Sequence, residues 1–314
     1  MSDIVLSADL GGTNLRMAAV SGSGDILARV KNRTPFESTS AEIVDLIVES
    51  VEACRKEVSG AKALVLAVPG TVNPSSGIIT NAPNIPTLDD FDLAKAVSAI
   101  TGLPVFLEND ANAAAIGENW IGASRGALSS IMVTLGTGVG GGIIIGGEVI
   151  RGIDGTAGEI GHICVEPKGV KCGCGSHGCV EQYASATAIV RMAKEAYSAE
   201  VSNGSSNGNS FTSEYVFQRA LEGDERAIRI FTDQGQYLGI MLAGLLNTLN
   251  PEVVVIGGGV AAAADMFLPS LVSEIKARAY VEPATRAKIV LAELGDNAGI
   301  LGAAKLGFES SPVV

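Results

Sequence analysis

The sequence predicts a duplicated α/β fold, and three observations lead to this prediction. Apolar runs between residues 4 and 30 have the length of strands and are separated by Gly- and Ser-rich turns. The same succession of strand, glycine turn and strand restarts between residues 130 and 150. After each β-rich start, helical and strand patterns alternate, which is typical of α/β units. Two copies of one such unit account for the restart.

The elements of the first half are indicated by their apolar period and by the residues that end them. The helical period of residues 41–58 begins after Ser40 and stops at Ser59-Gly60, where glycine can end a helix. Residues 63–68 are mostly apolar up to Pro69-Gly70, which indicates a buried strand. We expect strands at Ile4–Asp9, Leu15–Val20, Ile26–Val30, Ala63–Val68 and Pro104–Leu107, and helices at Ala41–Val58, Phe91–Ile100 and Asp110–Trp120.

The second half follows the same rules, with one low-complexity interruption. We expect strands at Ser130–Leu135, Gly140–Ile145, Glu148–Ile150, Val253–Ile256 and Lys288–Leu291, and helices at Ala227–Asn247, Ala264–Ala279 and Ala298–Leu306. The segment Ser198–Ser213 contains "SNGSSNGNS", which is typical of a mobile surface loop.

Length and composition limit the domain organisation. A chain of 314 residues, 47% apolar and 18% charged, is long enough for two globular domains. We expect a small α/β domain over residues 1–118, with the C-terminal helix at about 298–314 packing back on it. A larger α/β domain is expected over residues 119–297, carrying a loop rich in cysteine.

Charge and hydropathy exclude some classes of partner. The net charge is -12 and no cluster of Lys or Arg occurs, so nucleic acid is not expected as a partner. Residues 1–3 lead directly into an apolar run without the basic start of a signal peptide. The longest apolar runs are too short to span a membrane. We therefore expect a cytoplasmic protein without a membrane partner, in a compartment where cysteines stay reduced.

One glycine motif matches a dinucleotide fingerprint, but its context argues against that function. "GTGVGG" at residues 136–141 fits G-x-G-x-x-G after a strand. The fingerprint requires a helix to follow, because the helix N-terminus holds the pyrophosphate. Here "GIIIGGEVI" follows, which indicates another strand. A Walker A motif is also excluded, since no Gly-Lys pair occurs in the chain.

Two similar glycine turns remain, "DLGGTN" at Asp9–Asn14 and "LGTGVGG" at Leu135–Gly141. Successive N–H groups of such turns can form a concavity that binds anions, to which the hydroxyls of Thr13 and Thr137 can add donors. Each alone is most simply a tight hairpin. Because they recur at matching positions of a duplicated fold, we expect paired phosphate loops that face each other across a cleft. A third cluster, "GGGV" at residues 257–260, fits either a base or ribose packed on bare backbone or merely a close strand–helix turn.

Four of the five cysteines and both histidines lie within residues 161–182. Three thiolates, from Cys172, Cys174 and Cys179, with one imidazole make a closed tetrahedral set typical of structural zinc. Spacing alone allows His162 or His177 as the fourth ligand, and three reduced thiols without metal are the alternative. Cys164 and Cys54 have apolar or helical surroundings and are expected to be buried.

Acidic residues mark two further places. "ENDANAAAIGE" sets Asn109-Asp110 between a strand end and an Ala-rich helix. Such residues are ordinary N-caps, or Asp110 faces a cleft at the carboxyl end of its strand and accepts a proton there. Glu159 and Glu181 flank the Cys/His loop, either as acceptors for the hydroxyl groups of a ligand or as solvated charges.

In their order along the chain, the motifs "DLGGTNLR", "ENDANAAAIGE", "LGTGVGGG", "GEIGH", "CGCGSHGCVE" and "GGGV" resemble the ROK family of sugar kinases, within the actin-like ATPase superfamily. The resemblance covers nearly the whole chain, and the bacterial-type glucokinases of that family are the most similar members. It implies a duplicated actin-like ATPase (ribonuclease H-like) fold, with two lobes and a cleft between them.

The resemblance also implies a role for each matching residue. It implies His162 as the fourth zinc ligand and Asp110 as the catalytic base. Asp9, ahead of the first glycine turn, is placed to act on Mg²⁺ through water, or it is simply a turn-forming residue. The resemblance implies sugar binding by Gly70, Asn84, Asn109, Asp110, Glu159, His162 and Glu181. It implies ATP binding by Asp9, Gly11, Gly12, Thr13, Asn14, Gly136, Thr137, Gly138, Gly257, Gly258 and Gly259.

The function implied is an ATP-dependent hexose kinase, with glucose as the expected substrate and O6 as the acceptor. Alternatives on the same scaffold are an N-acetylglucosamine or N-acetylmannosamine kinase, a fructokinase or an allokinase. The family also includes sugar-responsive repressors, which carry an N-terminal helix-turn-helix segment. Only three residues precede the first strand here, which argues against a repressor. A sugar sensor without catalysis and a homodimeric assembly are also considered.

Overall fold

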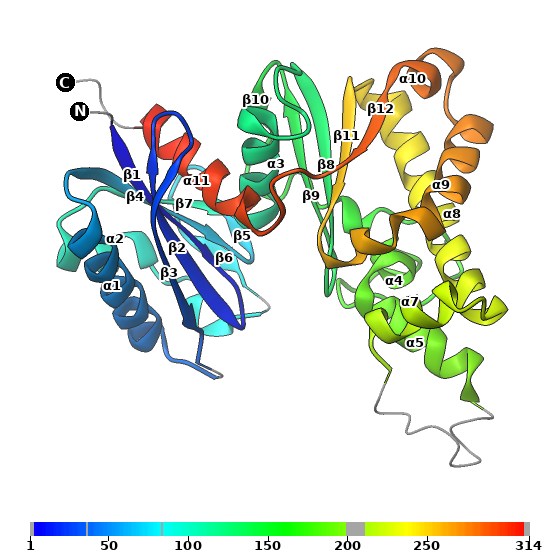
Figure 1. Ribbon diagram of the computed structural model, residues 1–314, viewed down its shortest axis with the longest axis horizontal. Coiled ribbons are helices and arrows are strands. Elements are labelled where there is room, and N and C mark those ends of the chain that lie inside the picture. Colours follow the sequence, from blue (N-terminus) through cyan, green and yellow to red (C-terminus); the bar gives the residue numbers. More distant parts are fainter. Residues whose placement is uncertain (1–2, 36, 83, 199–210, 311–314) are drawn as a thin grey trace. The chain divides into compact units, whose positions relative to one another are not determined.

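The computed structural model describes residues 3–35, 37–82, 84–198 and 211–310. Its strands form two five-stranded sheets and one small hairpin (Figure 1). The strands of the first sheet are β1 (Ile4–Leu10), β2 (Asn14–Ser21), β3 (Ile26–Arg33), β4 (Ala61–Val68) and β7 (Val105–Asn109). Those of the second are β8 (Ser129–Leu135), β9 (Val139–Ile145), β10 (Glu148–Val149), β11 (Val253–Gly257) and β12 (Lys288–Leu291). The hairpin is β5 (Thr71–Val72) with β6 (Ile79–Asn81).

The two large sheets have the same strand order. It is β3-β2-β1-β4-β7 in the first and β10-β9-β8-β11-β12 in the second, so that in each the first strand of the repeat lies at the centre. In the first sheet β1, β2 and β3 pair antiparallel, whereas β4 joins β1 and β7 in parallel. In the second, β9–β10 is antiparallel and β11–β12 is parallel. The duplicated α/β fold expected from the sequence is therefore confirmed.

The helices match the expected ones and add shorter ones. They are α1 (Ser40–Glu57), α2 (Leu93–Thr101), α3 (Asp110–Ile121), α4 (Glu181–Ala184), α5 (Ala186–Ala196), α7 (Ser213–Leu221), α8 (Glu225–Leu249), α9 (Ala264–Arg278), α10 (Val281–Arg286) and α11 (Ala298–Ser310). Helices α4, α5, α7 and α10, and the hairpin β5–β6, are absent from the sequence prediction. Most of the expected loop Ser198–Ser213 lies outside the described residues, and α7 begins at its last residue.

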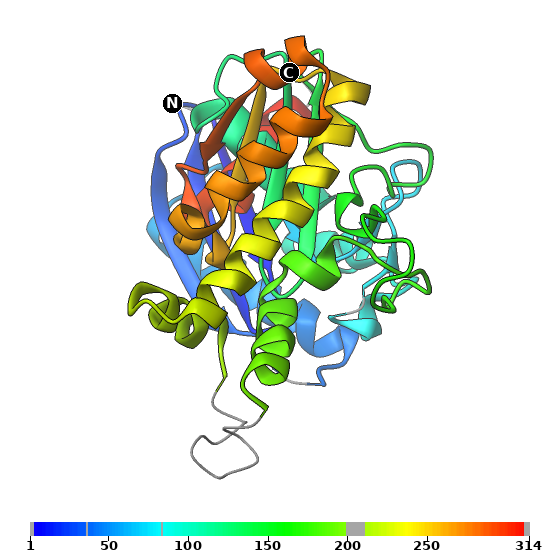
Figure 2. The ribbon, with the colours of Figure 1, turned by 90° about the vertical axis from the view of Figure 1, so that its right-hand side faces the viewer.

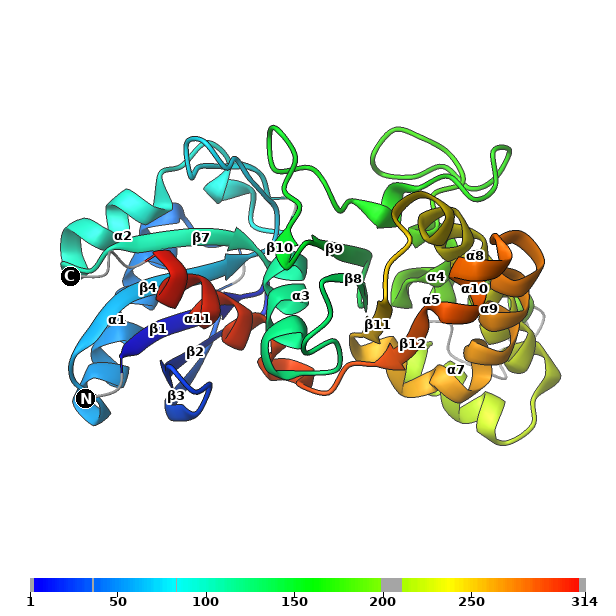
Figure 3. The same cartoon turned by 90° about the horizontal axis from the view of Figure 1, so that it is seen from above.

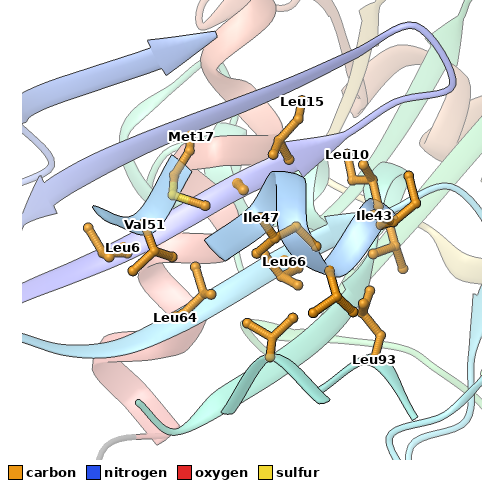
Figure 4. Packing of buried hydrophobic residues seen from close by; sticks show 14 of the residues in the cluster. Leu6, Leu10, Leu15, Met17, Ile43, Ile47, Val51, Leu64, Leu66 and Leu93 are labelled. Atoms are coloured by element: carbon orange, nitrogen blue, oxygen red, sulfur yellow. The ribbon is translucent and has the colours of Figure 1, made fainter. Parts of the chain in front are cut away.

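Both faces of the first sheet are buried, because successive side chains of a strand point to opposite faces. Leu6 and Leu10 of β1 belong to a core with α1 and α2, which includes Ile47 (Figure 4). Val5 of the same strand belongs to a second core, with Ile300 of α11. Helix α11 accordingly lies against β1 and β4 (Figure 3). Each fully buried leucine contributes roughly 1.5–3 kcal/mol to the free energy of unfolding.

The chain divides into two compact units, which we describe separately. Unit 1 comprises Met1–Met132, Gly142–Gly158 and Glu293–Val314, and in it α11 packs on α3. Its first stretch runs to Met132, beyond residue 118, where the sequence analysis placed the end of the first domain. Unit 2 comprises Val133–Gly141 and Glu159–Ala292, and in it α8 and α9 run side by side (Figure 2). Among the described residues, none of the helices combines the length and hydropathy that crossing a bilayer requires.

Candidate active site

The first glycine turn connects β1 to β2 in unit 1. Its turn is closed by the N–H of Gly11, which donates to the carbonyl of Asn14 at 2.9 Å. Thr34 holds the turn from the end of β3: its hydroxyl donates to the carbonyl of Gly11 at 2.8 Å, and its N–H donates to the carbonyl of Thr13 at 2.9 Å. The hairpin interpretation of this motif is thus correct, and two carbonyls of the turn are fixed by the buried Thr34, one through its hydroxyl and one through its backbone N–H.

Asp9 lies at the end of β1, directly before this turn. Arg16 faces it across the β1–β2 pair and places a guanidinium nitrogen 3.3 Å from its carboxylate, while a second nitrogen lies 3.0 Å from Asp296. Burial raises the pKa of Asp9, and the nearby Arg16 opposes part of that rise. A carboxylate has two oxygens, so Asp9 can accept from Arg16 and still reach a water molecule of a hydrated Mg²⁺. Sequence analysis did not single out Arg16 or Asp296.

The turn between β7 and α3 carries the expected base. Asn109 is the N-cap of α3: its side-chain oxygen accepts the N–H groups of Ala111 and Asn112 at 2.9 and 3.0 Å, and its side-chain nitrogen donates to the carbonyl of Gly70 at 3.0 Å. Asp110 is the first helical residue and is exposed. The ordinary capping role therefore belongs to Asn109, and the Asp110 carboxylate is accessible to a ligand at the positive end of α3.

The expected sugar residues of unit 1 lie close to this turn. Gly70 has φ +148°, and a Cβ there would collide with the carbonyl oxygen of Asn81, so only glycine fits. Asn84 follows Asn81 by three residues and lies beside the first glycine turn, since a Cβ on Gly12 would be 3.6 Å from its carbonyl oxygen. Asn109 thus contacts Gly70 directly, and Asn84 lies beside the first glycine turn.

A buried ion pair supports the Asn109–Asp110 turn, and sequence analysis did not identify it. Glu108 is 3% exposed. One of its oxygens accepts from Arg151 at 2.6 and 2.7 Å, and the other accepts from the backbone of Asn109 at 3.0 Å and the side chain of Asn112 at 3.1 Å. Such a forked contact fixes the carboxylate plane, and with it the peptide that leads into Asp110.

The second glycine turn connects β8 to β9 in unit 2, so the strand expected after it is confirmed and a dinucleotide fingerprint is excluded. The turn is closed by the N–H of Gly136, which donates to the carbonyl of Gly138 at 3.0 Å. Glu181 reaches it from α4 and accepts the N–H of Val139 at 3.1 Å. A Cβ on Gly138 would collide with that carboxylate. Glu181 therefore touches the glycine turn, besides its expected role toward the sugar.

The Cys/His loop brings together the four expected metal ligands. The ligand atoms of His162, Cys172, Cys174 and Cys179 all lie within 4.8 Å of one another. The sulfurs of Cys174 and Cys179 are 3.7 Å apart, and the sulfur of Cys172 is 3.6 Å from Nδ1 of His162. Zinc–ligand bonds of about 2.3 Å to sulfur and about 2.05 Å to nitrogen give tetrahedral edges of roughly 3.8 and 3.6 Å. The residues therefore fit zinc.

The rest of this loop distinguishes the two histidines. With Nδ1 of His162 among the sulfurs, its Nε2 lies 4.0 Å from Glu159 and can bind another partner. His177 instead pairs through its backbone with Lys171. Cys164 was expected to be buried but is exposed, although its backbone pairs with that of the buried Cys179. Cys54 is fully buried on α1, as expected.

A cavity of about 200 Å³ opens beside the second glycine turn, within unit 2. Gly257 ends β11, Gly258 follows it, and Gly259 begins the short helical turn that lines the cavity. The lining residues are Gly136, Thr137, Ala186, Ser213, Glu214, Phe217, Phe231, Gly259, Val260, Ala262 and Ala263. Sequence analysis missed the contribution of α7 because it follows the low-complexity segment.

The expected site residues therefore gather in two groups, one in each unit. Unit 1 holds Asp9, the first glycine turn, Gly70, Asn84, Asn109 and Asp110. Unit 2 holds the second glycine turn, Glu159, the metal ligands, Glu181 and the cavity. That the two glycine turns face each other across a cleft stays a prediction.

Comparisons with known proteins find similar sequences and structures over nearly the whole chain. A glucokinase from Halalkalibacterium halodurans is 37% identical, with 95% of this chain and 92% of that protein aligned. The crystal structure of a ROK family glucokinase from Streptomyces griseus, in complex with glucose and AMPPNP, superposes with a TM-score of 0.82 at 36% identity, over 98% of this chain and 100% of that one. A putative xylose repressor from Caldicellulosiruptor is 31% identical, over 95% of this chain and 76% of its own. The model of the ROK family matches residues 5–309, so the resemblance is confirmed and the chain belongs to the ROK family.

Proposed function

We propose that this protein is an ATP-dependent glucokinase that transfers the γ-phosphoryl group of ATP to O6 of glucose. The observation that carries the proposal is the full-length similarity, at 36–37% identity, to glucokinases that include one solved with glucose and an ATP analogue. N-acetylhexosamine kinases, fructokinases and allokinases of the same family are not favoured.

The residues of unit 1 are suited to align and activate the sugar. Asn109 is held by its cap bonds and by Gly70, so its position is fixed before glucose binds. Asp110 accepts a hydrogen bond from the O6 hydroxyl and takes its proton as O6 attacks the γ-phosphorus and ADP leaves. The buried Glu108–Arg151 pair keeps the peptide before Asp110 in place. Glu159, His162 and Glu181 of unit 2 are proposed to bind the other hydroxyls.

The nucleotide is proposed to use both glycine turns and the unit 2 cavity. The apolar lining from Phe217, Phe231 and Val260 suits the flat adenine ring, and Glu214 offers a carboxylate to hydroxyl donors. The N–H groups of the two turns bind phosphate oxygens. Mg²⁺, when bound, neutralises charge on the phosphates, and Asp9 is positioned to hold its hydration shell.

The Cys/His loop holds a structural zinc ion, because a closed Cys3His set leaves no coordination position for a substrate. A cytoplasmic location is proposed, since ATP and reduced thiols are both found there. A homodimer without nucleic acid is proposed as the assembly. The acidic net charge of -12 supports the second part, in spite of the similarity to a repressor.

The test is turnover of the wild-type protein and its Asp110→Asn variant with Mg·ATP and a panel of hexoses and N-acetylhexosamines. We expect the highest kcat/KM with glucose. The variant should lose about 100- to 10,000-fold in kcat, because it lacks the base, and should still bind glucose. A wild-type protein that binds glucose but consumes no ATP would be a sensor, and near-wild-type kcat in the variant would remove Asp110 from the base role.

A further inference from the structure

The Cys/His loop contacts the second glycine turn on both sides of the metal ligands. Before His162, Gly161 packs so closely on the carbonyl of Val139 that a Cβ would collide with it. After Cys179, Glu181 accepts the N–H of the same residue at 3.1 Å. Val139 is therefore held through its N–H and touched at its carbonyl by segments that each lie within two residues of a metal ligand.

The segment that follows continues this contact along the turn. The N–H of Ala186 donates to the carbonyl of Gly136 at 2.9 Å, and the hydroxyl of Thr187 donates to the carbonyl of Thr137 at 2.8 Å. Gln182, in the same stretch of chain, connects it directly to a metal ligand, because its side-chain nitrogen lies 3.7 Å from the sulfur of Cys172. We call Glu181–Thr187 the brace segment.

Peptide geometry shows what these bonds do to the turn. In a planar trans peptide the C=O and the following N–H point in opposite directions. Fixing the carbonyls of Gly136 and Thr137 toward the brace segment therefore directs the N–H groups of Thr137 and Gly138 away from it. Those are the donors that a phosphate group would use.

The brace segment is itself anchored at the far side from the turn. The buried side chain of Gln234, on α8, donates to the carbonyl of Ala184 at 3.0 Å, and Arg191 donates to the carbonyl of Gln182 at 2.7 Å. Helix α4 spans only Glu181–Ala184 and has little core of its own. Its position is thus set by α8 on one side and by the Cys/His loop on the other.

We propose that the metal centre positions the nucleotide as well as the sugar: Gly161 and the brace segment transmit the geometry of the Cys/His loop to the second glycine turn, so that loss of the metal weakens ATP binding when no sugar is present. Thr187 is a positioning residue in this arrangement, because its hydroxyl orients the turn from outside. The inference rests on the proposed function, since it assigns the second turn to phosphate.

The first experiment measures the dissociation constant of AMPPNP with Mg²⁺ by calorimetry, without sugar, for the zinc-loaded and the chelator-treated protein. We expect binding to weaken at least about fivefold on metal removal, as for the loss of one or more oriented hydrogen bonds, and to return when zinc is added back. Circular dichroism shows whether the depleted protein is folded. A folded, depleted protein with unchanged AMPPNP affinity would overturn the proposal.

The second experiment keeps the metal in place and decides the question if the depleted protein unfolds. Thr187→Val removes the hydroxyl at constant shape, whereas Thr187→Ser retains it. We expect the Val variant to bind AMPPNP about fivefold more weakly, the Ser variant to bind as wild type, and both to keep their zinc content and glucose affinity. Unchanged AMPPNP affinity in Thr187→Val would overturn the proposal. A wild-type protein that binds no AMPPNP and phosphorylates no glucose would instead overturn the proposed function.

Discussion

The two glycine turns occupy equivalent places, between the first and second strands of their sheets, yet they are held by different means. The first follows a partly buried carboxylate, Asp9, which pairs with Arg16. At the equivalent position before the second turn stands Thr134, and support comes instead from the Cys/His loop through Glu181. The duplicated fold thus places a glycine turn at the same point of each sheet, while the residues around each turn determine whether it adds charge or only oriented N–H groups.

One feature of the support is common to both turns. A threonine hydroxyl from elsewhere in the same unit donates to a turn carbonyl at 2.8 Å, from Thr34 in the first and from Thr187 in the second. Thr34 is buried and Thr187 is exposed. Loss of the Thr34 hydroxyl should therefore reduce the free energy of unfolding more than loss of the Thr187 hydroxyl does, because water can replace an exposed donor but not a buried one.

The largest difference between the turns should appear in the kinetics of two variants, in which Asp9 and the equivalent Thr134 are each replaced by an uncharged residue of similar size. We expect Asp9→Asn to lower kcat/KM for Mg·ATP by about 100-fold, because the site loses its charge for Mg²⁺. Thr134→Val, at the equivalent position of the second turn, should change it by less than about twofold. Steady-state kinetics over a range of Mg²⁺ concentration measure both. Equal losses in the two variants would mean that the turns do not divide charge and backbone roles in this way.

The fold was largely predictable because its signals are local and repeated. The short apolar run of β1, the glycine that follows α1 and the restart near residue 130 each depend on neighbouring residues only. The metal ligands were equally accessible, since three of them lie within eight residues of one another. Helices α4 and α7 were not, because each is short and is stabilised by contacts with distant residues, such as Gln234 on Ala184.

The contacts that connect the site residues were also beyond sequence reasoning. Arg151 lies 43 positions from Glu108, and Glu181 lies 42 positions from Val139, so no motif includes either pair. Cys164 shows a related failure, because its apolar neighbours suggested burial, whereas its side chain is exposed. Local patterns identify residue types and turns, but pairings across the fold follow only from its topology.

The next effect tests the steric side of the support for the second turn. Gly161→Ala places a methyl group against the carbonyl of Val139, so the turn must shift. We expect AMPPNP affinity to fall by about tenfold, from a strain of the size caused by overpacking. Gly173→Ala is the matched control, since a Cβ at this glycine of the same loop meets nothing within 4 Å. Calorimetric titration of both variants would contradict the arrangement if Gly161→Ala bound the analogue as well as Gly173→Ala does.

A smaller effect is expected at the buried threonine of the first turn. Thr34→Val leaves the carbonyl of Gly11 without the hydroxyl that donates to it at 2.8 Å. Loss of this partly buried hydrogen bond should raise KM for ATP by about fivefold or less. Thr34→Ser keeps the donor and should restore the wild-type value. Should the Ser and Val variants behave alike, the effect would come from packing and not from the hydroxyl.

The smallest effect concerns stability and pH at Asp9. Burial raises the pKa of this carboxyl in the folded state above its unfolded value of 3.8, so the folded chain holds its proton to higher pH. As pH rises through this interval the free energy of unfolding falls, and the deficit persists at neutral pH. The Asp9→Asn variant has no carboxyl to ionise, so it avoids this loss of stability. Near neutral pH it should melt at the wild-type temperature or up to about a few °C above it. The difference should vanish below about pH 3.5, where Asp9 is protonated in both states. Thermal melting followed by circular dichroism across this range measures the difference. A variant that melts several degrees lower at neutral pH would show that the ion pair with Arg16 stabilises the folded state by more than the burial of Asp9 destabilises it. The charged carboxylate would then add to the free energy of unfolding.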